Sequence, residues 1–384
     1  MIDHLNAVLG AVSPSPIRAF SRMAAQAPGC VRLTLGEPDF DTPAPVRDAV
    51  TDALDAGETH YIENSGAPAL RGAIAAFERE KNGLPYGAED VIVTIGATEA
   101  LFVALFGLLN PGDEVIVPTP AFVLYERIIG LCRGVFVALD TEPDGFQLRA
   151  ARLEAALTPR TKAIVLNSPN NPTGCVYDRE SLEAVRAVAA KRGLFVICDD
   201  VYRQLCYEAD YHSFAEYQIL RDRIIVIQSF SKPYAMTGWR LGYLLADGPI
   251  RERLALVHQF MVTSAPAPFQ RAGVAALACD PAPMVAEYRR RRDYAFARLN
   301  DMGLETPLPG GAFYLFPSVA RFGMDSTTFC TRLLKEGGVA VTPGAAFGAD
   351  GRVRVSYACD MDALLEGLDR MARFVRRLEG GDRL

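Results

Sequence analysis

The chain has 384 residues, of which 50% are hydrophobic and 22% are charged. A chain of this length favours two domains over one hydrophobic core, and its composition argues against disorder. The net charge of −6 provides no attraction to a phosphate backbone, so we expect no nucleic-acid partner.

The N-terminal sequence Met1-Ile-Asp-His-Leu lacks a basic segment followed by an apolar stretch, so we expect no signal peptide. The longest apolar run, residues 100–109, has about half of the ~20 residues that a membrane-spanning helix requires, so we expect no membrane partner. The eight cysteines are scattered singly and the four histidines lack ligand spacing. Free thiols, no metal site and a cytoplasmic location are therefore expected.

Residues 1–47 are rich in proline and show little hydrophobic periodicity. We expect them to form an N-terminal arm and part of a small domain. The following residues alternate short β-branched runs with amphipathic helical patterns. The clearest helices are expected at 100–109 and 179–192, the second between Asp178 as N-cap and Gly193. The expected strands span residues 91–95, 114–117, 163–166, 194–198, 224–227 and 241–245.

These strands are almost wholly apolar, which is typical of strands buried on both faces. Strands that alternate with helices indicate βαβ units. We therefore predict an α/β fold whose large domain, residues 48–280, contains a mostly parallel sheet covered by helices. Residues 281–384 mix helical patterns with short strands and predict a smaller C-terminal α+β domain.

Four consecutive arginines occupy residues 289–292. They continue into a segment in which Tyr288, Phe296 and Leu299 recur at roughly helical spacing. A charge run on such a segment is usually a solvated helix face, and we predict one here.

Polar side chains follow several of the expected strands at their carboxyl ends, where ligands bind in parallel α/β sheets. Residues 96–98 follow the first strand and are placed to open a helix, which favours an anion site. Singly, each residue has an ordinary structural explanation, such as a cap, a turn or a solvated lysine; together they predict one polar site. The other residues placed at this edge are Asn171, Asp199, Tyr202, Ser229, Ser231, Lys232 and Arg240.

Two common nucleotide-binding fingerprints are missing from the sequence. Neither G-x-G-x-x-G nor G-x-x-x-x-G-K-[ST] occurs. Dinucleotide and P-loop sites are therefore not expected.

The segment Ser229-Phe-Ser-Lys-Pro-Tyr-Ala-Met-Thr-Gly-Trp-Arg-Leu-Gly-Tyr resembles the lysine signature of class I aminotransferases of PLP fold type I. Three further segments are similar to other motifs of that family, in family order: Leu35-Gly-Glu-Pro-Asp-Phe, Asn167-Ser-Pro-Asn-Asn-Pro-Thr-Gly and Val353-Arg-Val-Ser-Tyr-Ala. The end segments Ser15-Pro-Ile-Arg and Ala358-Cys-Asp-Met-Asp look most similar to bacterial PatA-type aminotransferases. The resemblance covers nearly the whole chain.

The resemblance implies pyridoxal 5′-phosphate (PLP) as cofactor and a role for each matching residue. Lys232 would bind PLP as a Schiff base and later carry the substrate Cα proton. Asp199 would pair with the pyridine N–H, while Tyr202 and Asn171 would hydrogen-bond the ring hydroxyl. The ring would pack between Phe122 and Val201. The phosphate would be held by Ala97, Thr98, Ser229, Ser231 and Arg240.

The resemblance also implies which residues bind the substrate and which residue reaches the partner subunit. Arg354 would bind the α-carboxylate in a bidentate pair, beside Gly36 and Asn171. Tyr61 matches a residue that reaches the phosphate of the neighbouring subunit, which implies a homodimer with shared active sites.

Some positions depart from the family pattern. Asp199 is followed by Asp200 where glutamate is common, and Pro233 restricts the backbone of Lys232. Thr98 stands where some acid-specific members carry a lysine, and no second arginine can be assigned to a side-chain carboxylate. An aspartate-specific enzyme is therefore not expected.

The implied function is a PLP-dependent aminotransferase with ping-pong turnover through the pyridoxamine form of the cofactor. It would use 2-oxoglutarate as acceptor and a neutral or long polar L-amino acid of the diaminopimelate type as donor. A lyase of the same fold, such as a C–S β-lyase or a cyclopropane-forming synthase, shares these residues and remains an alternative. A PLP-binding transcription regulator would need a DNA-binding module ahead of the fold, and we do not expect one.

Overall fold

The structure is a computed structural model that describes residues 6–12, 14, 16–207 and 211–380. Met1 to Leu5, on which the expectation of no signal peptide rests, and Ser15, the first residue of a family-like segment, lie outside the described residues. No helix within those ranges is both long enough and apolar enough to cross a membrane.

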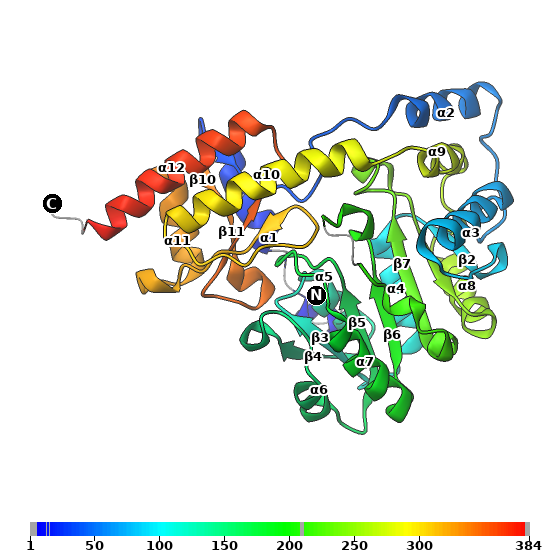
Figure 1. The fold of residues 1–384 in the computed structure, drawn as a ribbon. Coiled ribbons are helices and arrows are strands. Elements are labelled where there is room, and N and C mark those ends of the chain that lie inside the picture. Colours follow the sequence, from blue (N-terminus) through cyan, green and yellow to red (C-terminus); the bar gives the residue numbers. More distant parts are fainter. Residues whose placement is uncertain (1–5, 13, 15, 208–210, 381–384) are drawn as a thin grey trace.

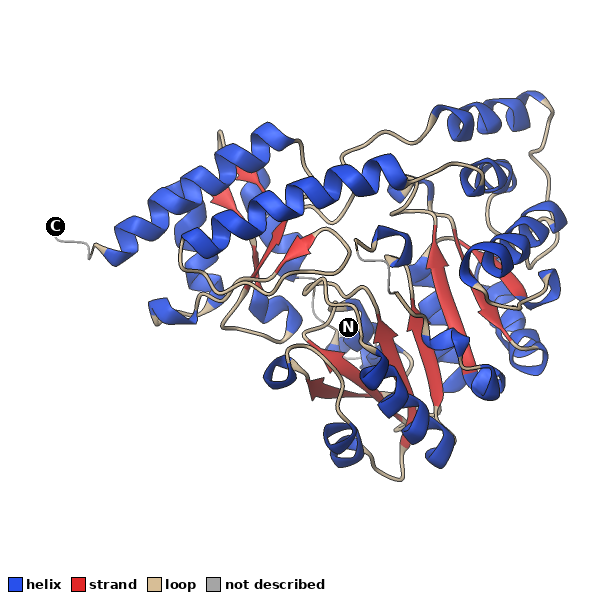
Figure 2. Cartoon of the chain, in the orientation of Figure 1, coloured by secondary structure: helices blue, strands red, loops and turns tan. Residues whose placement is uncertain are grey.

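A seven-stranded sheet lies at the centre of the larger body of the chain (Figures 1 and 2). Its strand order is β2-β8-β7-β6-β5-β3-β4. Strand β8 is antiparallel to both neighbours and every other pair is parallel, which confirms the predicted mostly parallel sheet. The strands are β2 (Val91–Thr94), β3 (Glu114–Thr119), β4 (Val135–Asp140), β5 (Thr161–Asn167), β6 (Phe195–Asp199), β7 (Ile224–Ser229) and β8 (Gly242–Ala246).

Successive residues of the central strands face opposite sides of the sheet, and each side has its own hydrophobic core. In β7, Ile225 and Ile227 join one core, whereas Ile224 and Val226 join the other. The first core is closed by α4 (Ala97–Leu108), α5 (Leu124–Leu131) and α8 (Gly248–Val262). The second is closed by α3 (Pro68–Asn82), α7 (Arg179–Arg192) and α9 (Ala267–Leu277), with α2 (Ala44–Asp55) and α6 (Ala150–Ala156) beside them.

Strand β4 was not among the expected strands. It lies at the edge of the sheet, and only one of its six residues is buried. Its first five residues, Val-Phe-Val-Ala-Leu, nevertheless form a continuous apolar run like those of the central strands, so the signal was present and the sequence analysis overlooked it. By contrast, α7 is confirmed with both caps: the Asp178 side chain accepts from the Ser181 N–H, and Gly193 has φ +69°.

A second body contains the C-terminal part of the chain, with the long helices α10 (Ala282–Asp301) and α12 (Met361–Glu379) packed on each other (Figure 1). Residues of α1 (Pro16–Ala25) join its core, and β1 (Val31–Arg32) pairs in parallel with β10 (Val339–Ala340). We therefore propose that residues 1–47 contribute to the small domain formed by 281–384, and that 48–280 form the large one. The remaining elements of the second body are α11 (Ser326–Arg332), β9 (Tyr314–Leu315), β11 (Thr342–Pro343) and β12 (Val353–Ser356).

The prediction of a solvated arginine run is wrong for two of the four residues. Arg291 and Arg292 are only 5% and 3% exposed. The Arg291 Nη1 atom lies 2.8 Å from Asp39 Oδ1, and Arg292 Nη1 donates to the Pro309 carbonyl at 3.1 Å. Arg291 and Arg292 follow the buried Tyr288 by three and four residues, so they lie on the same face of α10, which packs against the rest of the domain. Their position on this face leads to their burial despite their charge.

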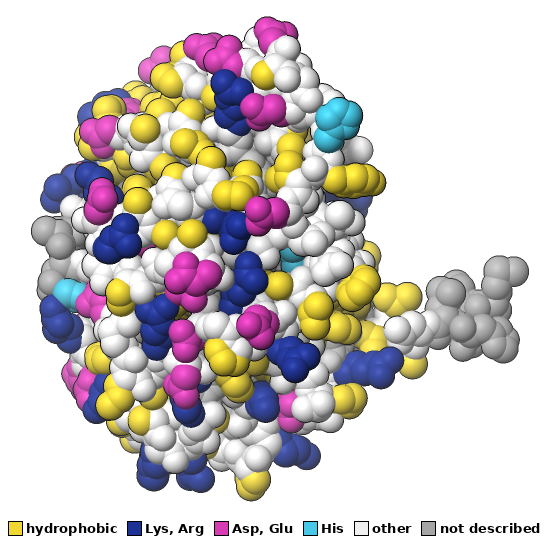
Figure 3. Space-filling view, turned by 90° about the vertical axis from the view of Figure 1, so that its right-hand side faces the viewer, with side chains coloured by type: hydrophobic (Ala, Val, Ile, Leu, Met, Phe, Trp, Pro, Cys, Tyr) yellow, Lys and Arg dark blue, Asp and Glu magenta, His cyan; other side chains and the backbone are white. Residues whose placement is uncertain are grey.

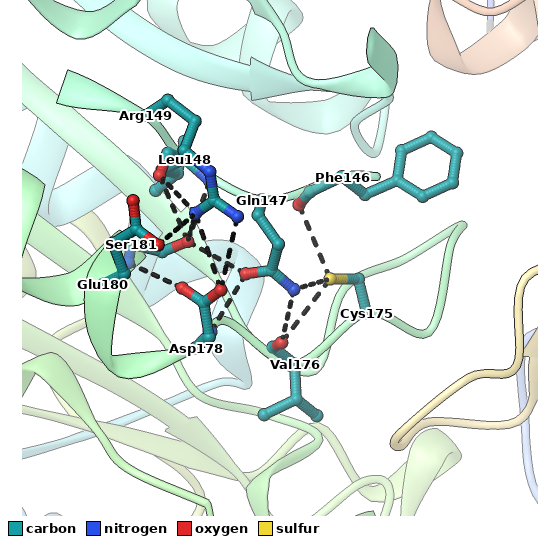
Figure 4. A network of polar contacts seen from close by, with 9 residues as sticks. All are labelled: Phe146, Gln147, Leu148, Arg149, Cys175, Val176, Asp178, Glu180 and Ser181. Atoms are coloured by element: carbon teal, nitrogen blue, oxygen red, sulfur yellow. Dashed lines mark hydrogen bonds and ion pairs between the residues drawn. The ribbon is translucent and has the colours of Figure 1, made fainter. Parts of the chain in front are cut away.

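A polar network anchors the turn that follows β5 to the loop that follows β4 (Figure 4). The Gln147 amide donates to the Val176 carbonyl at 3.1 Å, and its oxygen accepts from the backbone N–H of Asp178 and the Ser181 hydroxyl, both at 2.9 Å. Burial raises the pKa of the neighbouring Cys175 thiol to about 12, so this cysteine stays neutral. The network fixes the C-terminal end of the loop that contains Asn171.

Candidate active site

A cavity of about 530 Å³ lies beyond the carboxyl ends of the parallel strands, between the central sheet and the second body. Every residue expected in the site except Tyr61 lines this cavity. The residues that the structure brings together are Gly36, Ala97, Thr98, Phe122, Asn171, Asp199, Val201, Tyr202, Ser229, Ser231, Lys232, Arg240 and Arg354.

Lys232 lies in the turn after β7 and, among the residues that the structure describes, is the only lysine that lines the cavity. Its Nζ atom donates to the Gly36 carbonyl at 2.6 Å. Burial lowers the pKa of Lys232 to about 8, with Arg354 and Arg240 adding to the effect and Glu37 opposing it. A sizeable neutral fraction is therefore present near neutral pH, and a neutral amine can act as a nucleophile or a base.

Asp199 ends β6 at the floor of the cavity. Its Oδ2 atom accepts a 2.6 Å hydrogen bond from the Tyr125 hydroxyl, while its Oδ1 atom is buried with no hydrogen-bond partner. Burial raises the pKa of Asp199 to about 6, and the adjacent Asp200 adds to this. The unpartnered oxygen can accept a hydrogen bond from an N–H group of a bound molecule.

The start of α4 and the Arg240 guanidinium form an anion-binding corner. Gly96 precedes the helix with φ +89°, and a Cβ atom there would lie 2.5 Å from Arg240 Nη2, so only glycine permits this approach. Arg240 donates to the carbonyls of Thr237 at 2.8 Å and Ile95 at 3.5 Å. Backbone N–H groups, a helix dipole and a guanidinium together suit a phosphate group.

Arg354, on β12, forms the opposite end of the cavity. Its Nη1 atom donates to Asn171 Oδ1 at 2.9 Å and its Nη2 atom to the Thr34 carbonyl at 3.0 Å. The Tyr314 ring packs on the guanidinium, 4.3 Å from centroid to Cζ. The Nε atom is buried without a partner, so this cation is held in place with a donor available for an anion.

Sequence reasoning missed several residues of the site. Tyr314 lies 3.0 Å from Tyr202, hydroxyl to hydroxyl, and a Cβ atom on Gly36 would approach its hydroxyl to 3.0 Å. Arg18 of α1 also lines the cavity. Tyr125 follows Phe122 by three residues, and this spacing could have marked it. Arg18 belongs to the Ser15-Pro-Ile-Arg segment of the family resemblance but was given no role, and Tyr314 comes from a segment distant in sequence.

Tyr61 lies apart from the cavity. Its side chain is 90% exposed and borders a second cavity of about 630 Å³, lined by residues from α2, α3, α9 and the loop 57–62. It therefore does not contribute to the site of its own chain.

Residues 28–371 match the model of the family "Aminotransferase class I and II". The chain belongs to this family. It is 42% identical to the Bacillus subtilis "probable N-acetyl-LL-diaminopimelate aminotransferase", over 97% of this chain and 96% of that protein. It is 39% identical to the aspartate aminotransferase of Pyrococcus abyssi, over 96% of this chain and 97% of that protein.

Solved structures agree with this assignment. The aspartate aminotransferase of Thermus thermophilus, solved with maleate, superposes with a TM-score of 0.91 at 38% identity, over 96% of this chain and 99% of that one. The protein is thus a PLP-dependent aminotransferase of fold type I.

The cavity of this aminotransferase fits PLP on its own chemistry. PLP combines an aldehyde, a phosphate and a pyridine ring whose nitrogen can carry a proton. Lys232 offers an amine for the aldehyde, the Gly96–Arg240 corner suits the phosphate, and the unpartnered Oδ1 atom of Asp199 suits the ring N–H. Lys232, Asp199 and Arg240 all line the same cavity.

Proposed function

We propose that this aminotransferase binds PLP through Lys232 and transfers amino groups between an L-amino acid and a 2-oxo acid, with 2-oxoglutarate as the usual acceptor. The observation that carries the assignment is the buried, unpartnered Oδ1 atom of Asp199 in the same cavity as the amine of Lys232. When bound, PLP supplies an electron sink that stabilises negative charge at the substrate Cα.

The cofactor would be positioned by residues from the ends of five strands, β2, β3, β5, β6 and β7. Asp199 would accept a hydrogen bond from the ring nitrogen, and Tyr125 holds the carboxylate in the orientation that leaves Oδ1 without a partner. Phe122 and Val201 provide apolar walls for the ring, while Tyr202 and Asn171 provide polar groups for its hydroxyl. The phosphate is bound by the N–H groups of Ala97 and Thr98, the hydroxyls of Ser229 and Ser231, and Arg240.

Lys232 also moves the proton during turnover. Its lowered pKa of about 8 allows the released amine to accept the Cα proton as a neutral base. Arg354 orients the substrate by its α-carboxylate, with its guanidinium already fixed by Asn171 and Thr34. Fixing the carboxylate before reaction directs the Cα proton toward Lys232 and lowers the entropic cost of reaction.

The donor is proposed to be a neutral or long polar amino acid, of the kind named for the Bacillus subtilis relative. Thr98 offers no charge for a side-chain carboxylate, and Glu37 places an anion on the cavity wall. A short acidic side chain would remain poorly paired there, at a cost of several kcal/mol. Arg18 at the α1 side of the cavity is the cation that we assign to the distal carboxylate of 2-oxoglutarate.

We further propose a homodimer in which Tyr61 reaches the phosphate bound by the partner. Exposed hydrophobic side chains gather on the surface that carries α2, α4, α8 and α9 (Figure 3), and such patches mark interaction sites. All eight cysteines are free, which suits the cytoplasmic location that we propose. The exposed residues of this surface are Leu54, Tyr61, Phe106, Leu256, Phe260, Met261 and Val274.

A panel of amino acids tests the function directly. Each is mixed with holoenzyme without an oxo acid, and the absorbance change from the pyridoxal to the pyridoxamine form is followed. We expect conversion by acetylated diaminopimelate, methionine or phenylalanine at a kcat/KM at least about tenfold above that for aspartate. Tenfold preference for aspartate would contradict the proposed donor class, and release of ammonia with no pyridoxamine form would indicate a lyase.

A further inference from the structure

A buried histidine–glutamate pair connects the phosphate corner to the segment that carries Tyr61. His258, on α8, is fully buried, and Glu99, in the first turn of α4, is 3% exposed. The Nδ1 atom of His258 lies 2.6 Å from Glu99 Oε1, and its Nε2 atom lies 2.7 Å from the Asn64 carbonyl oxygen. Neither residue lines the active-site cavity.

The contacts of this pair determine where its protons lie. A carbonyl oxygen can only accept, so His258 Nε2 carries a proton and donates it to Asn64. The second contact, between Nδ1 and Oε1, holds another proton between the imidazole and the carboxylate. Every hydrogen-bonding atom of the pair is therefore used, as expected for polar groups retained without access to water.

Glu99 also connects His258 to the phosphate corner through hydrogen bonds. Its other oxygen, Oε2, accepts from the Ile95 N–H at 2.6 Å, and the Ile95 carbonyl accepts from Arg240 at 3.5 Å. The peptide groups on either side of Ile95 thus orient both the strained Gly96 turn and the guanidinium that faces it. Replacement of Glu99 by an apolar residue would leave the Ile95 N–H unpaired.

His258 connects the pair to the surface segment that carries Tyr61 through its hydrogen bond to Asn64. Asn64 is three residues from Tyr61, and its side chain donates to the Thr263 carbonyl at the end of α8 at 2.8 Å. The neighbouring Ser65 carbonyl accepts from the Val93 N–H at 3.0 Å, which fixes the segment beside β2. Phe260, two residues beyond His258, is 84% exposed on the proposed dimer surface.

We propose that His258 and Glu99 are positioning residues that couple the phosphate corner of one chain to the Tyr61 segment, which serves the phosphate of the other chain. This inference rests on the proposed placement of the phosphate and on the proposed dimer. Its consequence is that PLP binding at the two sites of the dimer depends on one buried pair in each chain.

The test measures the PLP dissociation constant of apoenzyme by absorbance titration. His258→Gln should raise this constant about tenfold, as expected for loss of a hydrogen bond to a charged group. The matched control is His212→Gln, since His212 pairs with Glu216 at 3.0 Å and does not line the cavity, and the dissociation constant of this variant should stay within about twofold of wild type. Thermal unfolding of each apoenzyme identifies variants that fail to fold.

Coupling is tested by a double-mutant cycle with Tyr61→Phe. If the pair acts through Asn64, the increase in the PLP dissociation constant of the double variant Tyr61→Phe/His258→Gln should be smaller than the product of the increases in the two single variants. Fully multiplicative losses, or an unchanged constant in folded His258→Gln, would overturn the inference. Arg240→Ala distinguishes failure of the proposed function: if this variant binds PLP normally, the phosphate assignment itself is wrong.

Glu99→Gln keeps the inference testable if His258→Gln does not fold. Glutamine retains an acceptor for the Ile95 N–H but removes the charge that pairs with His258. We expect a rise of about threefold in the dissociation constant and a shifted phosphorus-31 resonance of bound PLP. A resonance identical to wild type in both variants would show that the pair serves folding alone and would refute the proposal.

Discussion

The Tyr125 hydroxyl donates a 2.6 Å hydrogen bond to Asp199 Oδ2, while Oδ1 of the same carboxylate is buried without a partner. Half of the carboxylate is therefore satisfied by the protein and half is left for a ligand. A buried charge with an unused acceptor is costly in the absence of that ligand, and burial accordingly raises the pKa of Asp199 to about 6. The proposed cofactor site would thus be prepared at the expense of apoenzyme stability.

We predict that Asp199→Asn raises the unfolding temperature of the apoenzyme at pH 7.5 while it weakens PLP binding and lowers kcat by at least about a hundredfold. The pKa of Asp199 is raised from 3.8 to about 6, so the folded state penalises its ionised form. This penalty is complete above about pH 6 and disappears near pH 4, where the carboxyl is protonated in both states. The stabilisation measured by calorimetry should disappear over the same range.

Asp222→Asn is the matched control. Asp222 is exposed and paired with Arg223, which lowers its pKa, so its neutralisation should not stabilise the apoenzyme. An Asp199→Asn apoenzyme less stable than wild type at pH 7.5 would contradict the argument.

We predict that borohydride reduction of the holoenzyme, followed by peptide mapping, places the phosphopyridoxyl group on Lys232. Lys232→Ala should still bind PLP through the phosphate corner and Asp199, but should lose turnover by several orders of magnitude because the base is removed with the anchor. Lys162→Ala, which changes a lysine outside the cavity, should retain full activity. Label on another lysine would refute the assignment.

The strand ends were predictable from sequence because apolar runs and turn residues are local signals. Lys232, Asp199 and Asn171 follow such runs directly, and parallel strands bring their ends to one edge. Arg354 was reached only by family resemblance, Arg18 was part of a family-like segment but was given no role, and Tyr314 was not reached at all, because their placement depends on packing between the two bodies of the chain. No local pattern encodes that packing.

Burial at α10 was also hidden from local reasoning. Charge suggested a solvated face, yet Arg291 is held by Asp39, a residue more than 200 positions earlier in the chain. Long-range partners allow an arginine to be buried, and a single sequence does not reveal them.

We predict that PLP reconstitution of the apoenzyme accelerates with pH up to about 8 and then levels off. The neutral amine of Lys232 attacks the aldehyde, and burial lowers the pKa of this amine to about 8, so the reactive fraction increases as pH approaches that value. Glu37 raises the pKa of Lys232, so Glu37→Gln should move the profile to lower pH. Stopped-flow absorbance provides the rates, and a rate still rising steeply above pH 9.5 would disprove the lowered pKa.

We predict that heterodimers of Tyr61→Ala and Lys232→Ala chains recover activity that neither homodimer has. If Tyr61 serves the partner's phosphate, one of the two sites in the heterodimer combines an intact Lys232 with a Tyr61 from the other chain. Up to about half of wild-type activity per dimer is expected by this count. Differently tagged chains allow the heterodimer to be purified, and activity no greater than that of the parents would contradict the shared site.

We predict that Arg18→Ala raises KM for 2-oxoglutarate about tenfold and leaves KM for pyruvate within about twofold, because only the first acceptor has a distal carboxylate. Arg18 lines the cavity from α1, whereas we assign Arg240 to the phosphate and Arg354 to the α-carboxylate. Arg22, which lies on α1 but does not line the cavity, provides the control, and Arg22→Ala should leave both constants unchanged. Arg18→Lys retains the charge but not the bidentate geometry, so an intermediate KM is expected. An equal increase in KM for both acceptors in Arg18→Ala would indicate that α1 closes the cavity and that Arg18 does not bind the distal carboxylate.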